Sequence, residues 1–369
     1  MKNEIQNKNQ ISSFMVFFLL FVSITEVWIL SFQRSLMYHA GYDSWISVAI
    51  TGLSIHLIIG MIYKIISSSE ERLDLVSINR NCFGLVMGKV LDFAVMIYFF
   101  FGAFLTFREY IAVIQVWLFP TMPIIPLILF IFVLLYYIVT GGISTITGLS
   151  LWGMFAAIVC ILPLLTMVFS YLHPENLKPT LSHSLIDILS SSKTMILQYI
   201  GFESLLMFHP FIQSPEKSQK WAHAAVFSST LIFLSLSLIS FMFYSEGQLR
   251  LVIWPSLHIY MLLSLPLFQR LEYLVLSIFF ITIIANISLG LWAACRSVKR
   301  SFRIHQRMSL IVFLILFLVL TEWVKKYTLL RQLAGHYTNV GLYFIYVYIP
   351  ILFIITIIKK RKHKTSPNL

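Results

Sequence analysis

The sequence predicts an all-α integral membrane protein with about ten transmembrane helices. Of its 369 residues, 59% are hydrophobic and only 11% are charged, whereas charged residues make up about 25% of an ordinary soluble domain. The mean hydropathy is +0.86. Since about 20 apolar residues cross one bilayer, the chain is long enough for ten spans with short connections. These observations exclude a soluble globular fold.

Ten apolar segments, each bounded by charged residues or proline, follow one another along the chain. They lie near residues 12–35, 44–66, 91–118, 124–140, 146–171, 190–212, 222–245, 268–295, 308–324 and 338–358. We therefore expect one transmembrane domain over 1–369, with a short cytoplasmic N-terminus (1–11), helices over about 12–358 and a basic cytoplasmic tail (359–369). Because the first segment shows no small-residue cleavage site, we expect a retained helix and not a signal peptide.

The basic residues predict the orientation of these segments. With the N-terminus in the cytoplasm, 18 of the 27 Lys and Arg residues fall in predicted cytoplasmic segments and 8 in outer ones, and Arg108 lies within a span. This bias favours two cytoplasmic termini. The net charge of +12 is thereby explained by topology and by attraction to anionic lipid, without a nucleic-acid partner. The inner loop near 67–89 is predicted to form a short amphipathic helix on the membrane.

Four ionisable residues inside the predicted spans stand out, because an unpaired charge is costly there. Glu26 lies in the first span, Arg108 and Glu109 in the third, and Glu203 in the sixth. We interpret Arg108 and Glu109 as a structural pair near the outer end of their helix. Glu26 and Glu203 are the candidates for a binding function.

Polar or flexible positions in three spans suggest where a helix opens or contacts another. Gly201, beside Glu203, fits a helix broken at mid-membrane, as in transporter binding sites, or a close helix contact. The corresponding part of the first span, near Glu26, contains polar residues but no glycine or proline. In the eighth span, Thr282, Asn286 and Ser288 either face a cavity or hydrogen-bond to another helix.

Neither catalytic nor metal-binding motifs are visible. The sequence contains no serine nucleophile elbow, phosphate-binding loop or dinucleotide fingerprint. Cys82, Cys160 and Cys295 are far apart, and the ten histidines have no metal-ligand spacing. We expect neither an enzyme nor a cofactor or metal site.

Several short motifs resemble those of one known family over about Ile11 to Lys362. They are Ala40-Gly41-Tyr42-Asp43-Ser44-Trp45-Ile46, Gly141-Gly142-Ile143, Tyr199-Ile200-Gly201-Phe202-Glu203, Ile253-Trp254-Pro255 and Leu265-Pro266-Leu267-Phe268-Gln269-Arg270-Leu271-Glu272. In this order and spacing, they resemble the B subunits of spore germinant receptors, the endospore germination permeases of Bacillus and its relatives.

This resemblance implies a fold and a function. The family is placed in the amino acid/polyamine/organocation transporter superfamily, which implies a LeuT-like fold of two inverted five-helix repeats with broken first and sixth helices. Its B subunits are thought to lie in the inner spore membrane beside a larger A subunit and a lipoprotein C subunit, and to sense nutrients such as amino acids. We expect the same partners, membrane lipids and a small nutrient ligand here. The alternative is a proton- or sodium-coupled amino acid permease in which Glu203 handles the ion.

Carried over by position, the resemblance implies a ligand pocket formed by the first, third, sixth and eighth spans. Its residues would be Ser23, Thr25, Glu26, Tyr98, Gly102, Tyr199, Ile200, Gly201, Phe202, Glu203, Ile284 and Ala285. The chain departs from the family at Glu26 and Trp28, where relatives usually have a glycine-containing stretch. Since a carboxylate at Glu26 repels a ligand carboxylate and attracts an ammonium, a different or cationic germinant, a proton-linked site and a degenerate pocket all remain open.

Overall fold

The computed structural model describes residues 10–68, 72–263 and 270–365, with side chains as far as Lys360. Several sequence-based expectations lie outside this part of the chain. They concern residues 1–9 of the predicted cytoplasmic N-terminus, residues 69–71 of the predicted inner loop, the motif residues 265–269, and the side chains of the basic tail that follow Lys360.

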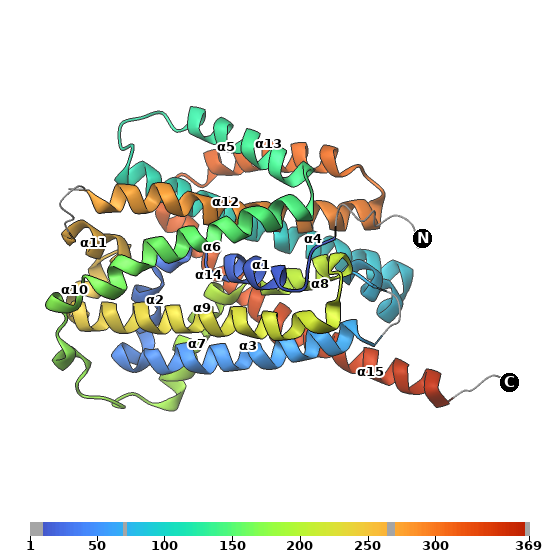
Figure 1. Ribbon diagram of the computed structural model, residues 1–369, viewed down its shortest axis with the longest axis horizontal. Coiled ribbons are helices and arrows are strands. Elements are labelled where there is room, and N and C mark those ends of the chain that lie inside the picture. The colour runs from blue at the N-terminus through green and yellow to red at the C-terminus, as the bar shows by residue number, and fades with distance from the viewer. Residues whose placement is uncertain (1–9, 69–71, 264–269, 366–369) are drawn as a thin grey trace.

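The described residues are helical almost throughout, and no β-strand occurs among them (Figure 1). The helices are α1 (Met15–Ile24), α2 (Phe32–Ala40), α3 (Trp45–Ile66), α4 (Leu75–Trp117), α5 (Ile125–Thr140), α6 (Ile143–Thr166), α7 (Leu185–Tyr199), α8 (Leu205–Phe208), α9 (Pro215–Phe243), α10 (Glu246–Leu251), α11 (Pro255–Leu262), α12 (Leu271–Phe302), α13 (Gln306–Trp323), α14 (Tyr327–Tyr343) and α15 (Ile349–Thr365). The predicted all-α class is confirmed.

Seven helical segments within the described residues are long and apolar enough to cross a membrane. They are Phe32–Ile66, Leu75–Trp117, Ile143–Thr166, Pro215–Phe243, Leu271–Phe302, Gln306–Trp323 and Tyr327–Lys360. Each of the ten predicted segments contains helix, but α1 has only 10 residues, α5 has 16, and the sixth segment is divided into α7 and α8. Ten complete crossings and the inverted repeat therefore stay predictions.

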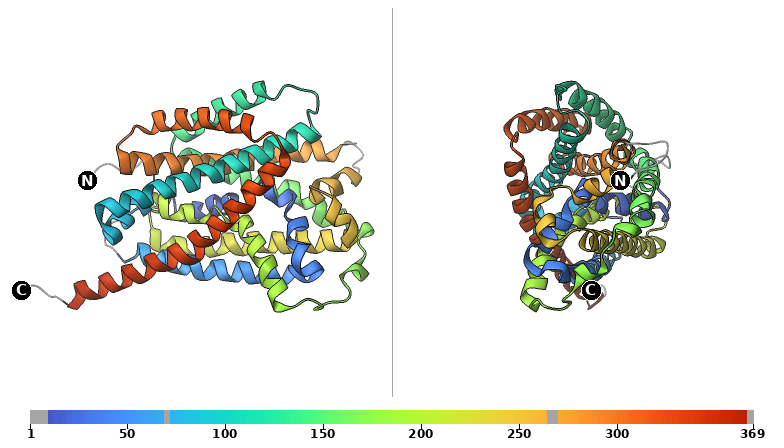
Figure 2. Two further views of the ribbon diagram at one scale, coloured as in Figure 1. Left: turned by 180° about the vertical axis from the view of Figure 1, so that it is seen from behind. Right: turned by 90° about the vertical axis from the view of Figure 1, so that its left-hand side faces the viewer.

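The interior is built around two long helices, α4 and α12, which pack along each other. α12 also packs on α6, and α1 lies in the middle of the molecule against α6, α9 and α12 (Figures 1 and 2). The short helices α1 and α8 are thus surrounded by longer ones. This enclosure places the ends of interrupted helices in the centre of the molecule.

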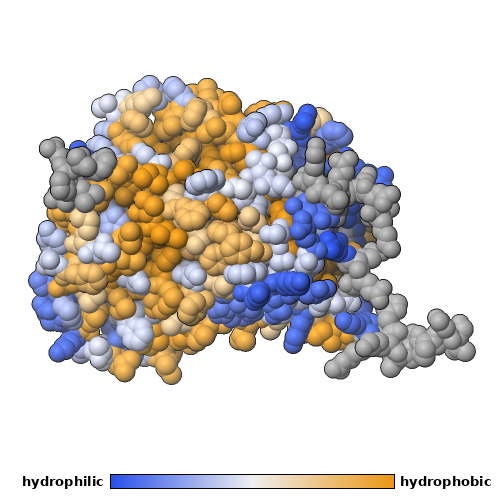
Figure 3. Space-filling model, in the orientation of Figure 1, coloured by the Kyte–Doolittle hydropathy of each residue, from blue (hydrophilic) through white to orange (hydrophobic). Residues whose placement is uncertain are grey.

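The surface carries an apolar region suited to a lipid environment. In Figure 3, hydrophobic residues cover most of the middle of the visible face, and hydrophilic residues gather toward its two ends. Large apolar side chains such as Leu57 on α3, Val133 on α5 and Trp152 on α6 are at least 65% exposed. Apolar surface on this scale, combined with the long apolar helices, is that of an integral membrane protein.

Three apolar side chains at the start of α4 pack against the protein, and the amphipathic helix on the membrane stays a prediction. Leu75, Val76 and Ile78 are buried in the protein, and the helix bends at Gly84, whose φ is +80°. Asp74 caps the helix and forms ion pairs with Arg296 and Arg300 of α12, at 2.9 and 3.1 Å. The apolar face of this segment therefore packs on the bundle, because α12 supplies both its contacts and its countercharges.

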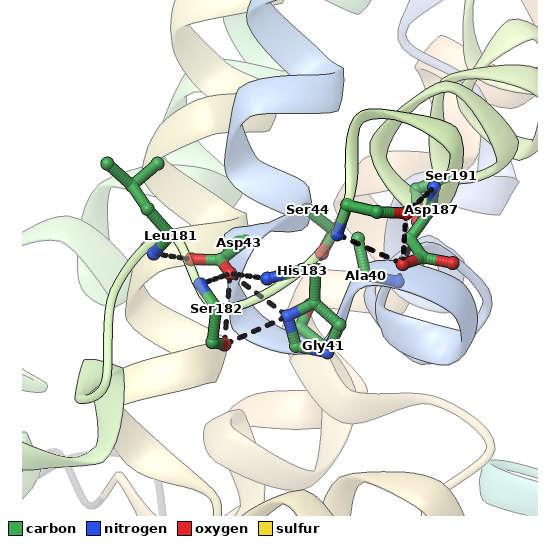
Figure 4. A network of polar contacts seen from close by, with 10 residues as sticks. Ala40, Gly41, Asp43, Ser44, Leu181, Ser182, His183, Asp187 and Ser191 are labelled. Atoms are coloured by element: carbon green, nitrogen blue, oxygen red, sulfur yellow. Dashed lines mark hydrogen bonds and ion pairs between the residues drawn. The ribbon is translucent and has the colours of Figure 1, made fainter.

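The corner between α2 and α3 fastens the loop that precedes α7 (Figure 4). The buried Asp43 carboxylate accepts hydrogen bonds from the backbone N–H groups of Leu181, Ser182 and His183 at 2.7, 2.8 and 3.1 Å. His183 Nδ1 lies 2.9 Å from the same carboxylate. At Gly41 (φ +49°) an added Cβ would lie 2.7 Å from the His183 ring. The motif around Asp43 thus has a structural role, joining α2 to the start of α7.

We predict that Asp43→Asn destabilises the protein, because an amide group presents N–H donors to backbone N–H donors. Loss of several hydrogen bonds to a buried charge is expected to cost at least about 2 kcal/mol. Thermal unfolding of the purified protein in detergent measures the effect. Glu246→Gln is the matched control, since its carboxylate is 48% exposed and its ion pair with Arg250 is long, at 3.9 Å. Equal melting temperatures for the two variants would contradict the anchoring role of Asp43.

Candidate functional site

The first predicted span is interrupted although its sequence contains neither glycine nor proline at that point. α1 ends at Ile24, Glu26 has extended backbone (φ −111°, ψ −174°), and a 3₁₀ turn (Val27–Leu30) leads to α2. An interrupted helix leaves carbonyl groups without helical partners. The Asn286 side chain of α12 donates to the carbonyls of Val22 and Ser23 at 3.2 and 3.0 Å. A neighbouring helix therefore supplies the cap that the local sequence lacks.

The sixth predicted span is interrupted at Gly201, where φ is +120°. α7 ends just before Ile200, and a 3₁₀ turn (Phe202–Ser204) leads to α8. The Glu203 carboxylate accepts from the Gly201 N–H at 2.9 and 3.0 Å and from the Tyr98 hydroxyl at 2.7 Å. A Cβ on Gly201 would lie 2.5 Å from the Ser23 carbonyl oxygen. Glycine thus serves both roles proposed from sequence, the helix break and the close contact.

A cavity of about 40 Å³ lies between these two interruptions, α4 and α12. It is lined by Ser23, Glu26, Trp28, Phe99, Gly102, Ala103, Leu105, Thr106, Leu197, Ile200, Gly201, Glu203, Ser204, Asn286, Leu289, Gly290 and Tyr337. Because a single water molecule needs about 10–15 Å³ of such space, the cavity has room for only a few waters in this conformation. A larger ligand requires the walls to move.

Two carboxylates occupy the cavity wall, and its described lining includes no Lys, Arg or His. Glu26 is 5% exposed and Glu203 is fully buried. Thr106 donates a hydrogen bond to one oxygen of Glu26, and Tyr98 and Gly201 donate to Glu203. The site therefore offers hydrogen-bond acceptors to whatever enters it.

A wider vestibule of about 420 Å³ adjoins the cavity on the side of α2, α7 and α14. Trp28 and Leu197 line both spaces. The vestibule carries the cationic side chains Arg331 and Lys193, and the Arg331 guanidinium lies 5.7 Å from the centre of the Trp28 ring. Trp28 thus stands where a ligand would pass from the vestibule into the cavity.

The sequence-predicted site residues divide into two groups in space. Ser23, Glu26, Gly102, Ile200, Gly201 and Glu203 line the cavity, whereas Thr25, Tyr98, Tyr199, Phe202, Ile284 and Ala285 are buried beside it or elsewhere. Tyr98 supports Glu203, and the Tyr199 hydroxyl hydrogen-bonds to Thr230 at 2.8 Å. Their binding role is untested and stays a prediction.

Helical periodicity could have found several lining residues that the sequence reasoning missed. On α12 the cavity is lined by Asn286, Leu289 and Gly290, which are spaced three and four residues apart and share one face. On α4 the lining positions Phe99, Gly102, Ala103 and Thr106 follow the same spacing. Leu105, Leu197, Ser204 and Tyr337 were also missed, and Tyr337 comes from α14, which no predicted motif joined to the site. Trp28, noted from the sequence as a departure from the family, lines the cavity as well.

The remaining polar residues in the spans hold helices together. Arg108 donates to the carbonyls of Val324 and Lys325 at 2.8 and 3.2 Å, while Glu109 accepts from Trp254 and Tyr327 at 3.0 and 3.1 Å. These two neighbours therefore bind different partners, which corrects the interpretation of a structural pair. Adjacent helix residues point in different directions, so they cannot share one contact.

On α12, the two other singled-out hydroxyl groups behave differently from each other. Thr282 donates to the Gly153 carbonyl of α6 at 2.6 Å, which is an interhelical hydrogen bond. The Ser288 hydroxyl is buried without a hydrogen-bond partner among the described residues. Within that part of the chain, no three His, Cys, Asp or Glu side chains gather as a metal-ligand set.

We predict that Gly201→Ala lowers the melting temperature. The added Cβ meets the Ser23 carbonyl, and the φ of +120° at this position is strained for a residue with a side chain. Strain of this kind costs about 1–3 kcal/mol. Gly60→Ala on α3 is the control, since a Cβ there meets nothing within 4 Å. Thermal unfolding of both purified variants tests the close approach. If Gly201→Ala melts no earlier than Gly60→Ala, the close approach of the two interrupted helices does not depend on glycine at position 201.

Comparisons with known proteins agree with the sequence resemblance. The profile of a family described as spore germination proteins matches residues 10–330. Spore germination protein GerQB of Bacillus cereus is 31% identical over 352 residues, covering 94% of this chain and 95% of that protein.

Among solved structures, the fold is similar to that of two cation-coupled symporters. The first is a Na⁺-coupled sialic acid symporter in a substrate-bound outward-open state, with a TM-score of 0.65, 11% identity, and 91% of this chain and 79% of that chain covered. The second is Mhp1, a nucleobase-cation-symport-1 family transporter, with a TM-score of 0.62, 13% identity, and 94% and 78% covered. These similarities confirm the LeuT-like fold. Together, the profile match over most of its length and the extended identity to GerQB show that the chain belongs to the spore germination protein family.

Proposed function

We propose that this protein is the B-type subunit of a spore germinant receptor, which binds a small nutrient between its two interrupted helices and thereby triggers germination. The observation that carries the proposal is the cavity with two carboxylates that these helices enclose, in a chain that belongs to the spore germination protein family. Interrupted helices at the centre of a membrane protein offer polar backbone and side-chain groups to a ligand.

The proposal includes a route for the ligand and a means of response. A nutrient enters through the vestibule, passes Trp28 and expands the small cavity. Because Ser23 and Gly201 are in direct contact, a ligand between them changes the spacing of both interrupted helices. Asp43 links α2 to the start of α7, so the segment after the first interruption and the segment before the second shift together.

The proposed setting follows from the family and from the charge distribution. We place the protein in the inner membrane of the spore with both termini in the cytoplasm, as the basic residues favour. Its partners are an A-type subunit and a C-type lipoprotein subunit. The role is ligand recognition and signalling, without catalysis.

Deleting the gene in a spore-forming host that lacks all other germinant receptors is expected to abolish germination on the nutrient that this receptor senses. Spores of the deletion strain and the parent are exposed to a panel of amino acids, amines, sugars and nucleosides, and the loss of optical density is followed. Reintroducing the gene is expected to restore the response. Identical responses of the parent and the deletion strain across the panel would contradict a receptor role.

The fold supports a second candidate, a proton- or sodium-coupled amino acid permease. The observation that favours it is the succession of vestibule and cavity in a fold shared with symporters. The two functions differ in net flux across the membrane.

We predict ligand binding without accumulation when the purified protein is placed in liposomes under an imposed Na⁺ or proton gradient. A sensor requires a change of conformation but no complete transport cycle. Uptake of labelled amino acids is measured against empty liposomes, and binding is measured on the same preparation. Accumulation above the empty vesicles that collapses with the gradient would favour the permease.

A further inference from the structure

We propose that the cavity recognises a protonated amine, held among Glu26, Glu203 and Ser204, and that amines without an adjacent carboxylate are the preferred ligands. This inference rests on the proposed function, because it names the chemical class of the nutrient. It selects one of the alternatives that the sequence left open at Glu26.

The charges of the cavity wall favour a cation. Glu26 and Glu203 both line the space and are at most 5% exposed, and the described lining contains no basic side chain. Thr106 donates to Oε2 of Glu26, which leaves Oε1 for another donor. Glu203 Oε2 accepts a hydrogen bond from the Gly201 N–H at 2.9 Å. Since carboxylates buried together without a countercharge are unfavourable, a cationic ligand relieves their repulsion.

Ser204 gives independent evidence for a ligand. Its side chain lines the cavity and is 2% exposed, and its Oγ is a buried polar atom without a hydrogen-bond partner among the described residues. Buried hydroxyl groups are satisfied in most proteins. Ser204 and both carboxylates line the same cavity, so its hydroxyl is a third acceptor for a ligand there. An ammonium group has three N–H donors.

The arrangement favours an ammonium over a metal ion. Hard cations such as Ca²⁺ and Mg²⁺ take about six or more oxygen ligands. The carbonyls of Val22 and Ser23, which the interruption of α1 leaves without helical partners, already accept from Asn286. Among the described residues no three His, Cys, Asp or Glu side chains gather as a metal-ligand set, whereas three acceptors are enough for an ammonium.

The same charges disfavour a carboxylate next to the amine. In a cavity of about 40 Å³, the carboxylate of an α-amino acid would lie close to Glu26 or Glu203. The cationic side chains Arg331 and Lys193 line the vestibule, on the other side of Trp28. A negative group on the ligand is therefore favourable only where it is separated from the amine and reaches the vestibule.

Three small molecules with the same carbon skeleton test this inference on the full-length protein in lipid nanodiscs. L-Alaninol has an amine and no carboxylate, L-alanine has both, and 1,2-propanediol has a hydroxyl in place of the amine. Binding is measured by calorimetry and by the shift in melting temperature. In a separate experiment, the melting temperature in NaCl is compared with that in KCl. We expect alaninol to bind at least about tenfold more tightly than either analogue, because a hydrogen bond to a charged group strengthens binding by about this factor.

Variants connect the selectivity to the named residues. Glu26→Gln is expected to weaken alaninol binding at least about tenfold, and Ser204→Ala about three- to tenfold, since it removes one uncharged acceptor. Glu246→Gln, outside the cavity on α10, is expected to leave the affinity unchanged. If Glu26→Gln does not fold, the ligand series on the wild type and Ser204→Ala remain sufficient.

Three results would overturn the inference. They are the absence of alaninol binding, equal affinities for alaninol and propanediol, and stabilisation by Na⁺ with none by the amine. If spores germinate on a neutral nutrient that binds the purified protein as weakly as L-alanine or 1,2-propanediol, the amine preference is overturned. The receptor role then stands. Failure of the receptor role itself appears separately, as unchanged germination after gene deletion.

Discussion

The contact between Ser23 and Gly201 brings two interrupted helices together inside a membrane protein, and the arrangement of the site depends on it. Backbone groups freed by an interruption must find partners within the protein, because lipid provides none. Asn286 supplies them for the first helix, and Glu203 supplies one for the Gly201 N–H. The two segments can approach only where one residue has no side chain, so Gly201 fixes their separation and the cavity forms beside their contact.

The polar groups around this contact have divided roles. Asn286 caps one interruption, while Glu203 stabilises the other and also faces the cavity. Glu26 has one oxygen held by Thr106, so it is less committed to structure than Glu203. Of the two carboxylates, Glu26 is therefore the better placed to determine what the cavity accepts, and Glu203 is the one whose loss also disturbs the fold.

The boundary between vestibule and cavity gives the site its two electrostatic environments. Arg331 and Lys193 make the vestibule basic, whereas the cavity is acidic. Trp28 lies between them with the Arg331 guanidinium near its ring, a geometry in which the cation and the ring attract each other. Glu26 and Trp28 thus bring a carboxylate and a large aromatic ring into the wall of the small cavity.

The sequence by itself determined the membrane location, the all-helical class, the family resemblance, and Gly201 and Glu203 as candidates. These follow from composition, from runs of about 20 apolar residues and from motifs that are local in the chain. Only the tertiary structure decided that the first helix opens without glycine or proline, because its cap comes from Asn286, more than 260 positions away. It also brought Tyr337 of α14 into the cavity wall and sent Arg108 and Glu109 to separate partners. Such contacts join residues distant in sequence, and local pattern does not encode which helices pack together.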